Sequence, residues 1–282
     1  MSEEIVNKKD AIYDLINKKL ELKQTTIKKN YFLRIVSVAA VILVLLTTGW
    51  ISFQKGYGDG MTELQAARVE VKSPVGTISE IVLPDGSLVS LNAGSRIIYP
   101  SVFDRNREIF LEGEAYFDVM KNEAQPFVVK SSTMCVQVLG TKFNLQAYPQ
   151  CSQTLLTLEE GSVEATTHVG ENIEKLILLP NQQLRLDNQT GELKRNKVNT
   201  SHYTSWRKGN LIFRDIPLED ITGVLERYFN VTIAYKDAKF KQEKYYVTFD
   251  NQETLDEILE LLSYQRNWKY TRNGQQIEIM KK

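Results

Sequence analysis

The sequence predicts a single-pass membrane protein with a β-rich domain on the far side of the bilayer and a small α+β domain at the C-terminal end. Three observations support this fold class. An uncharged apolar stretch occupies residues 35–53, basic residues precede it, and about a dozen short strand-like runs follow it.

Residues 35–53 read IVSVAAVILVLLTTGWISF, and a helix of this length covers about 30 Å, roughly one hydrocarbon core. A buried core helix and a cleaved signal peptide are the rival interpretations, but the sequence after Trp50 is a poor cleavage site. Five lysines and Arg34 lie in residues 18–34, whereas Lys55 is soon followed by acidic residues. The positive side stays in the cytoplasm, so we expect a cytoplasmic N-terminus.

The tail, residues 1–34, carries apolar side chains at helical spacing. Ile12, Leu15, Ile16 and Leu20 fall on one face, with lysines on the other. Such a helix suits either the surface of the lipid bilayer or a docking groove on a cytoplasmic partner, and composition does not separate the two.

After a polar connector at residues 54–72, residues 73–200 contain short alternating runs broken by turn residues. Asp85-Gly86 lies between two such runs and suits a primed hairpin turn, because glycine accepts a positive φ. This pattern predicts an all-β domain built as a sandwich, a barrel or a solenoid-like stack.

Residues 206–282 predict an α+β domain with the order β-α-β-β-α-β-β. Pro217 opens the first helix, and Thr254 with Glu257 fits a capping box at the start of the second. Residues 231–235 alternate as a strand, and Asn273-Gly274 suits the turn of a closing hairpin.

The composition of the chain excludes few classes of function. Lys plus Arg and Asp plus Glu both total 35, so no overall charge points to nucleic acid. Cys135 and Cys151 lack the partners of a zinc site, and we prefer two free cysteines to a disulfide, which an oxidising compartment would permit.

A catalytic site is not evident. His168 and His202 are isolated among polar neighbours, and we expect each to be a surface residue and not a base. No phosphate-binding glycine pattern occurs. Glu112 and Glu114 could share a strand face as an acid pair, but other carboxylates are equally plausible. We therefore expect no catalytic residues, cofactor or metal, and interpret the chain as a non-enzyme.

Six motifs resemble the FecR family of membrane-anchored sigma-factor regulators. They are LPDGSLVSLNAGSRIIYP (83–100), REIFLEGEAYFDV (107–119), PFVVK (126–130), VLGTKFNLQAY (138–148), TLEEGSV (157–163) and WRKGNLIF (206–213). The end of the chain resembles the C-terminal domain that often follows in this family. Its element order is also similar to the short N-terminal domain of secretins and TonB-dependent transducers.

The resemblance implies an inner-membrane anti-sigma factor with periplasmic C-terminal domains. It would relay a signal from an outer-membrane TonB-dependent transducer to a cytoplasmic extracytoplasmic-function sigma factor by protein contact, with an intramembrane protease as a further partner in some systems. We expect Ile12, Leu15, Ile16 and Leu20 to contact the sigma factor, although many relatives have a longer cytoplasmic part. Val231, Ile233 and Tyr235 would meet the transducer's signalling domain by strand addition. The alternatives are a membrane-anchored scaffold without a sigma partner and, more remotely, an anchored hydrolase.

Overall fold

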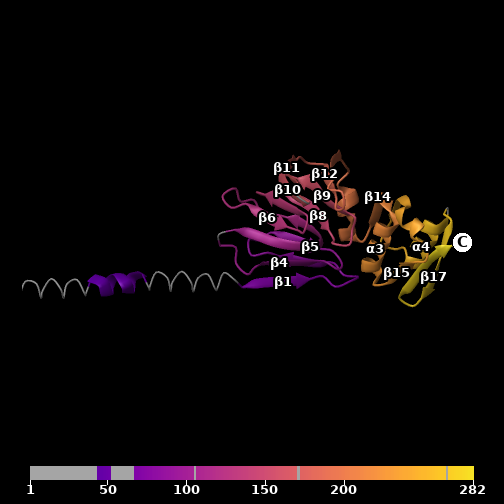
Figure 1. Ribbon diagram of the computed structural model, residues 1–282, viewed down its shortest axis with the longest axis horizontal. Helices are drawn as coiled ribbons and strands as arrows, with labels where there is room; N and C mark the ends of the chain where they lie inside the picture. Colours follow the sequence, from indigo (N-terminus) through magenta and orange to yellow (C-terminus); the bar gives the residue numbers. More distant parts are fainter. Residues whose placement is uncertain (1–42, 52–66, 105, 170–171, 265) are drawn as a thin grey trace, which may run out of the picture. The chain divides into compact units, whose positions relative to one another are not determined.

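The computed structural model describes residues 43–51, 67–104, 106–169, 172–264 and 266–282 (Figure 1). The chain divides into two compact units, Met1–Leu64 and Gln65–Lys282. In the first unit the described residues, 43–51, are helical.

The prediction of a single-pass membrane protein is corrected by this structure. Within the described residues, no helix combines the length and the apolar character needed to cross a membrane. The described helical part of the predicted span, residues 43–51, covers only about 14 Å at 1.5 Å per residue. The rest of that span and the tail lie outside the described residues.

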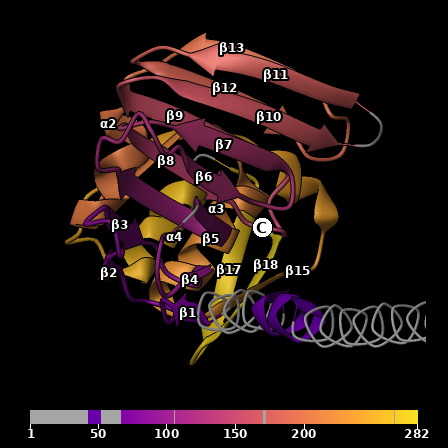
Figure 2. The same cartoon turned by 90° about the vertical axis from the view of Figure 1, so that its left-hand side faces the viewer.

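The second unit begins with a β-sandwich whose two sheets share one long strand, β5 (Arg107–Asp118). We call the sheets A and B. In sheet A the order is β11 (Asn172–Leu178), β10 (Val163–Val169), β7 (Met134–Val138), β6 (Phe127–Lys130), β5, β4 (Arg96–Pro100) and β1 (Arg68–Lys72). In sheet B it is β2 (Ser79–Val82), β3 (Leu88–Leu91), β5, β8 (Lys142–Ala147), β9 (Gln153–Glu160), β12 (Gln182–Asp187) and β13 (Leu193–Lys197) (Figure 2).

Strand β5 passes from one sheet to the other at a glycine. It pairs with β4 as far as Glu112 and with β3 from Ala115 onward. Gly113 between them has φ 106°, and a Cβ there would lie 2.8 Å from the Cα of Ser95. A side chain is therefore excluded both by backbone conformation and by space. The two sheets are the halves of one 13-stranded sheet that curls over a common core.

The core between the sheets is aromatic and aliphatic. The Phe117 ring stacks on Phe143 with centroids 4.8 Å apart and meets Phe127 edge-on at 6.3 Å. Strand β1 also belongs to sheet A, where it pairs with β4. The prediction of a polar connector at residues 54–72 is therefore wrong for residues 68–72. The alternation of Val69 and Val71 with charged residues explains this, because the two valines pack against the core.

The β2–β3 hairpin turns where the sequence predicted. Gly86 has φ 84°, and its N–H donates to the carbonyl of Leu83. The Asp85 carboxylate accepts from the N–H and the Oγ of Ser87, at 3.0 and 2.8 Å. The predicted position of the turn is confirmed, but the predicted primed type is wrong, because Gly86 has a positive φ and Asp85 does not.

Two short helices, α2 (Ser201–Thr204) and the 3-10 helix η1 (Ser205–Lys208), lead into the α+β domain. Its elements are β14 (Leu211–Pro217), α3 (Leu218–Phe229), β15 (Thr232–Tyr235), the 3-10 helix η2 (Ala238–Gln242), β16 (Lys244–Phe249), α4 (Leu255–Tyr264), β17 (Trp268–Asn273) and β18 (Gln276–Lys281). They form a two-stranded sheet, β14–β16, and a three-stranded sheet, β15–β18–β17. Both helices bury apolar faces in the domain core.

Local signals in this domain are mostly where the sequence placed them. The Thr254 N–H donates to the Glu257 carboxylate at 2.7 Å and Thr254 Oγ1 accepts from the Glu257 N–H at 3.4 Å, which confirms the capping box. Pro217 ends β14 and caps α3 instead of lying in its first turn. The closing turn is Gly274-Gln275, one residue later than predicted.

Candidate functional site

The outer face of sheet B carries polar side chains that are nevertheless buried. Asn144, Thr157 and Gln183 stand side by side on β8, β9 and β12 and expose 1–2% of their surface. Outward residues of a sandwich normally face water. Their burial means that another part of the chain covers this face, and that part includes η1.

A chain of hydrogen bonds ties η1 to the sheet. The indole Nε1 of Trp206 donates to Asn144 Oδ1 at 3.0 Å. Asn144 Nδ2 in turn donates to Glu114 Oε1 at 2.9 Å, and Asn92 Nδ2 donates to Glu114 Oε2 at 2.8 Å. Both carboxylate oxygens are thus satisfied, as a buried acid requires.

Burial raises the pKa of the Glu114 carboxyl above its ordinary value. The amide hydrogen bonds from Asn144 and Asn92, and the positive charge of Arg227, act in the opposite direction. Burial also raises the pKa of Asp220 on α3, whose carboxylate accepts from Ser152 Oγ at 2.9 Å. The junction between the two domains therefore contains two carboxyls that protonate more readily than usual.

Two arginines near the junction stack on tyrosines of the sandwich. The guanidinium carbon of Arg207 lies 3.6 Å from the ring centroid of Tyr116, and that of Arg227 lies 3.8 Å from that of Tyr148. The carbonyl of Arg227 also accepts from the N–H of Gly76 at 2.7 Å. Arg207 is exposed and Arg227 is half-buried, and cation–π contacts at such sites contribute about 0.5–2 kcal/mol each. These pairs therefore help fix η1 and the α+β domain on the sandwich.

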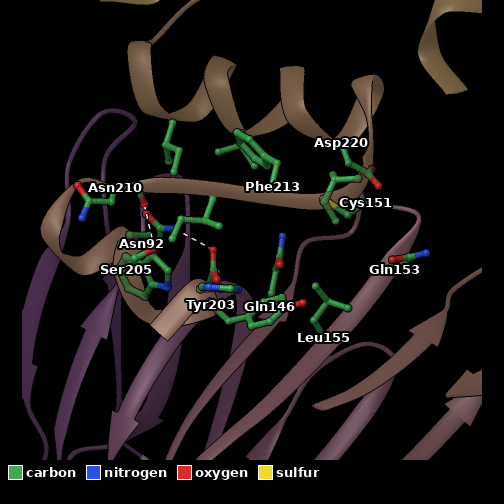
Figure 3. A pocket seen from close by; sticks show the side chains of 17 residues that line it. Asn92, Gln146, Cys151, Gln153, Leu155, Tyr203, Ser205, Asn210, Phe213 and Asp220 are labelled. Atoms are coloured by element: carbon green, nitrogen blue, oxygen red, sulfur yellow. Dashed lines mark hydrogen bonds between the residues drawn. The ribbon is translucent and has the colours of Figure 1, made fainter. Parts of the chain in front are cut away.

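A cavity of about 100 Å³ remains at this junction. Figure 3 shows it between the strands that carry Gln146 and Leu155 and the segment that carries Phe213, with α3 above. Cys151 and His202 line it as well. His202, which we expected at the surface, lies on α2 and is half-buried where it lines this cavity.

The carboxylates considered as an acid pair take separate partners. Glu112 binds the Arg96 guanidinium at 2.7 Å, whereas both oxygens of Glu114 bind amides of sheet B. The side chain of His168 is not among those that the structure describes. Among the described residues, no three metal-ligating side chains gather at one point. The contacts of Glu114 therefore suit a structural role at the junction of the two domains better than a role in acid–base catalysis.

Both cysteines are free. Cys135 lies on β7 and Cys151 follows β8 at the junction cavity, and both are half-buried. Burial raises the pKa of Cys151 to about 11, so its thiol stays protonated and unreactive at neutral pH.

The strand proposed to meet a transducer, β15, lies at the edge of its sheet. Thr232 and Lys236 donate their N–H groups toward β18, so in this parallel ladder the N–H groups of Ile233 and Tyr235 point away from it. Glu226 already accepts the Ile233 N–H at 2.6 Å. A partner strand would therefore compete with the Glu226 carboxylate.

The side chains of the three transducer-contact candidates face inward. Ile233 is buried in the core of the α+β domain, and Val231 and Tyr235 pack against that core. The Tyr235 hydroxyl lies 2.7 Å from Thr222 Oγ1 on α3. A partner strand would meet the backbone of β15 and the exposed side chains of Thr232 and Ala234. The sigma-contact candidates Ile12, Leu15, Ile16 and Leu20 lie outside the described residues.

Sequence comparison matches two family models to this chain in order. The FecR protein model matches residues 69–164, and the FecR C-terminal model matches residues 210–279. Two crystal structures of a "putative anti-sigma factor" from Parabacteroides distasonis ATCC 8503, at 2.50 and 1.65 Å resolution, are similar over the folded part. They are 30% and 31% identical, with TM-scores of 0.71 and 0.70, and the matches cover 77% and 76% of this chain and 100% and 99% of theirs.

The chain belongs to the FecR family. The first match runs from β1 to the start of β10, and the second covers the α+β domain. The elements that join the two, from β11 to η1, lie between the matched ranges. No curated protein matches this chain.

Proposed function

We propose that this FecR-family chain is an anti-sigma factor that binds an extracytoplasmic-function sigma factor. The observation that carries the proposal is the similarity to the Parabacteroides distasonis structures, because it extends over their whole length at 30% identity or more. The two family matches in sequential order support a regulatory role in the same way. Such a role requires binding surfaces and no covalent chemistry.

In this proposal residues 1–34 bind the sigma factor, with Ile12, Leu15, Ile16 and Leu20 as the apolar anchors of one helix. The folded domains receive the input. The Trp206 hydrogen bond and the two arginine–tyrosine stacks support a rigid attachment of the α+β domain to the sandwich. A contact made on either domain would then act on both as one body.

The proposed input is the signalling domain of a TonB-dependent transducer, which adds a strand to the free edge of β15. Because Glu226 holds the Ile233 N–H, the incoming strand must displace a carboxylate. Removing that carboxylate by Glu226→Ala should therefore make the edge easier to reach and tighten transducer binding severalfold. An unchanged affinity would argue against strand addition at β15.

Sigma binding is tested by co-purification of the full chain with each extracytoplasmic-function sigma factor of the cell. The test variant is Ile12→Asp with Ile16→Asp, and its matched control is Asn7→Asp with Asn17→Asp, which adds the same charge to the opposite helix face. Selective capture of one sigma factor that only the test variant loses supports the proposal. Equal capture of one sigma factor by all three proteins would contradict the assignment of the contact to Ile12 and Ile16. Capture by none of them favours a scaffold without a sigma partner.

A further inference from the structure

The outer face of sheet B is covered at one end and open at the other. Arg207 lies over Tyr116, but the next row of outward residues, Val82, Leu88, Asp118 and Lys142, lies beyond η1. A groove of about 610 Å³ runs along this row. It ends at β2, which among the described strands pairs with β3 alone and so forms the edge of the sheet.

The free side of β2 follows from its register. Leu83 donates its N–H to the carbonyl of Ser87, so these two residues form a hydrogen-bonded pair. In an antiparallel ladder such pairs alternate, which makes Ile81–Val89 the next bonded pair. The N–H and C=O groups of Glu80 and Val82 therefore point away from the sheet.

Apolar side chains flank this edge. Val82 is 70% exposed, Leu88 53% and Met120 54%. Val82 lies directly opposite Leu88 across the hairpin, and the Met120 N–H donates to Ser87 Oγ at 3.0 Å. Three exposed apolar side chains in neighbouring positions form a patch. Covering this patch removes apolar surface from water and therefore favours binding.

The charges of the groove are not balanced. Lys142 is engaged by Glu160 at 3.1 Å and by Asp118 at 3.9 Å, and the Arg207 guanidinium is stacked on Tyr116. Within the described part of the chain, neither Glu80 nor Glu159 has an ion-pair partner. Glu159 Oε2 is moreover buried without a hydrogen-bond partner there. The groove therefore offers carboxylates that lack a cation.

The hairpin that presents the edge is held firmly. The Arg107 guanidinium, 1% exposed, donates to Asp85 Oδ2 at 2.9 Å and to the carbonyls of Met120 and Gln125 at 2.8 and 2.6 Å. Asp85 in turn holds Ser87. A fixed edge loses little conformational entropy when a strand pairs with it, which favours binding.

We propose that β2 is a second docking edge, which binds an extended basic segment of a partner protein as an added antiparallel strand. The segment carries an apolar side chain opposite Val82 and, two residues later, a lysine or arginine opposite Glu80. Alternate side chains of a strand share a face, so both reach the groove. This surface is separate from β15 and does not depend on the transducer contact.

A second copy of the chain is the other conceivable occupant, because β13 at the opposite edge of sheet B reads LKRNK. Lysines on an edge strand are, however, a common protection against such pairing. Pairing of β2 of one copy with β13 of the next would also be head-to-tail, and such pairing continues from copy to copy unless its rotation closes a ring. We therefore commit to the partner segment and let the test separate the two.

The probe is the fluorescein-labelled peptide Thr-Val-Thr-Lys-Thr, titrated against the full chain by fluorescence polarisation. Glu80→Lys replaces attraction by repulsion across the strands, which should weaken binding about threefold to thirtyfold. Glu80→Pro removes only an outward N–H and should abolish it. Glu192→Lys, an exposed glutamate beside β13, is the matched control and should bind as the unaltered chain does. A peptide with glutamate in place of lysine should bind at least threefold more weakly.

Amide chemical shifts locate the bound peptide. Shifts confined to β2, β3 and their neighbours are expected. The proposal is overturned if the peptide does not bind at millimolar concentration, if Glu80→Lys binds equally well, or if the shifts fall elsewhere. Concentration-dependent self-association that Glu80→Lys removes would assign the edge to a second copy, and would overturn it as well.

Discussion

Replacement of Arg107 by methionine should destabilise the sandwich strongly. The guanidinium is 1% exposed, and its partner Asp85 is 12% exposed, so the pair is buried. Removing one member of a buried ion pair leaves the other uncompensated and costs about 3–5 kcal/mol. The carbonyls of Met120 and Gln125 also lose their donor. Urea denaturation followed by circular dichroism measures the loss, which corresponds to roughly 6–20 °C in Tm for a domain of this size.

Lys130→Met is the matched control. Lys130 pairs with Glu108 at 2.7 Å, but their side chains are 48% and 40% exposed, and such a pair contributes at most about 1 kcal/mol. If Arg107→Met lowered the free energy of unfolding no more than Lys130→Met, the buried pair would not hold the β2–β3 hairpin, and the rigidity assigned to that edge would be refuted.

Three further changes test the junction and the strand that joins the sheets. Gly113→Ala should lower the free energy of unfolding by more than about 2 kcal/mol, because φ at this residue is positive and the new Cβ would clash with Ser95. Gly274→Ala is its control and should lower the free energy of unfolding by about 1 kcal/mol in the same urea titration, because φ is positive but the space around the residue is open. Trp206→Phe removes the hydrogen-bond donor of the buried Asn144 Oδ1, and thermal scans should show a free energy of unfolding that is lower by about 1–3 kcal/mol. The raised pKa of Glu114 means that the folded state takes up its proton first as pH falls, so this group's contribution to the free energy of unfolding should rise from pH 7 to pH 5; Glu114→Gln should flatten that slope.

Local sequence signals predicted the local structure. A Gly with positive φ at residue 86 and a reciprocal Thr254–Glu257 cap depend on residues within a few positions, so the sequence shows them directly. Alternation of apolar and polar residues likewise indicates strands that expose one face to solvent. This rule fails on β8 and β9, where Asn144 and Thr157 lie on the outer face of the sheet but are buried.

The long-range contacts could not be predicted in this way. Trp206 and Asn144 are 62 residues apart, and Arg107 and Asp85 are 22 apart, and no spacing rule links them. A polar residue at an outward position and an arginine in a strand both look like surface residues. Only the fold shows that η1 covers the first and that the second is buried against Asp85 and the carbonyls of Met120 and Gln125. The membrane-spanning helix was predicted from the length of an uncharged apolar stretch and from its basic flank, and the described structure contains no helix that is long and apolar enough to cross a membrane.

The central claim is that this FecR-family chain is an anti-sigma factor, and run-off transcription tests it most directly. RNA polymerase holoenzyme formed with each extracytoplasmic-function sigma factor of the cell is assayed on its promoter with increasing full chain. The account predicts that transcription with one sigma factor falls as the chain saturates it, and that Ile12→Asp with Ile16→Asp removes the effect. Transcription that stays unchanged with every sigma factor at saturating chain would contradict the claim.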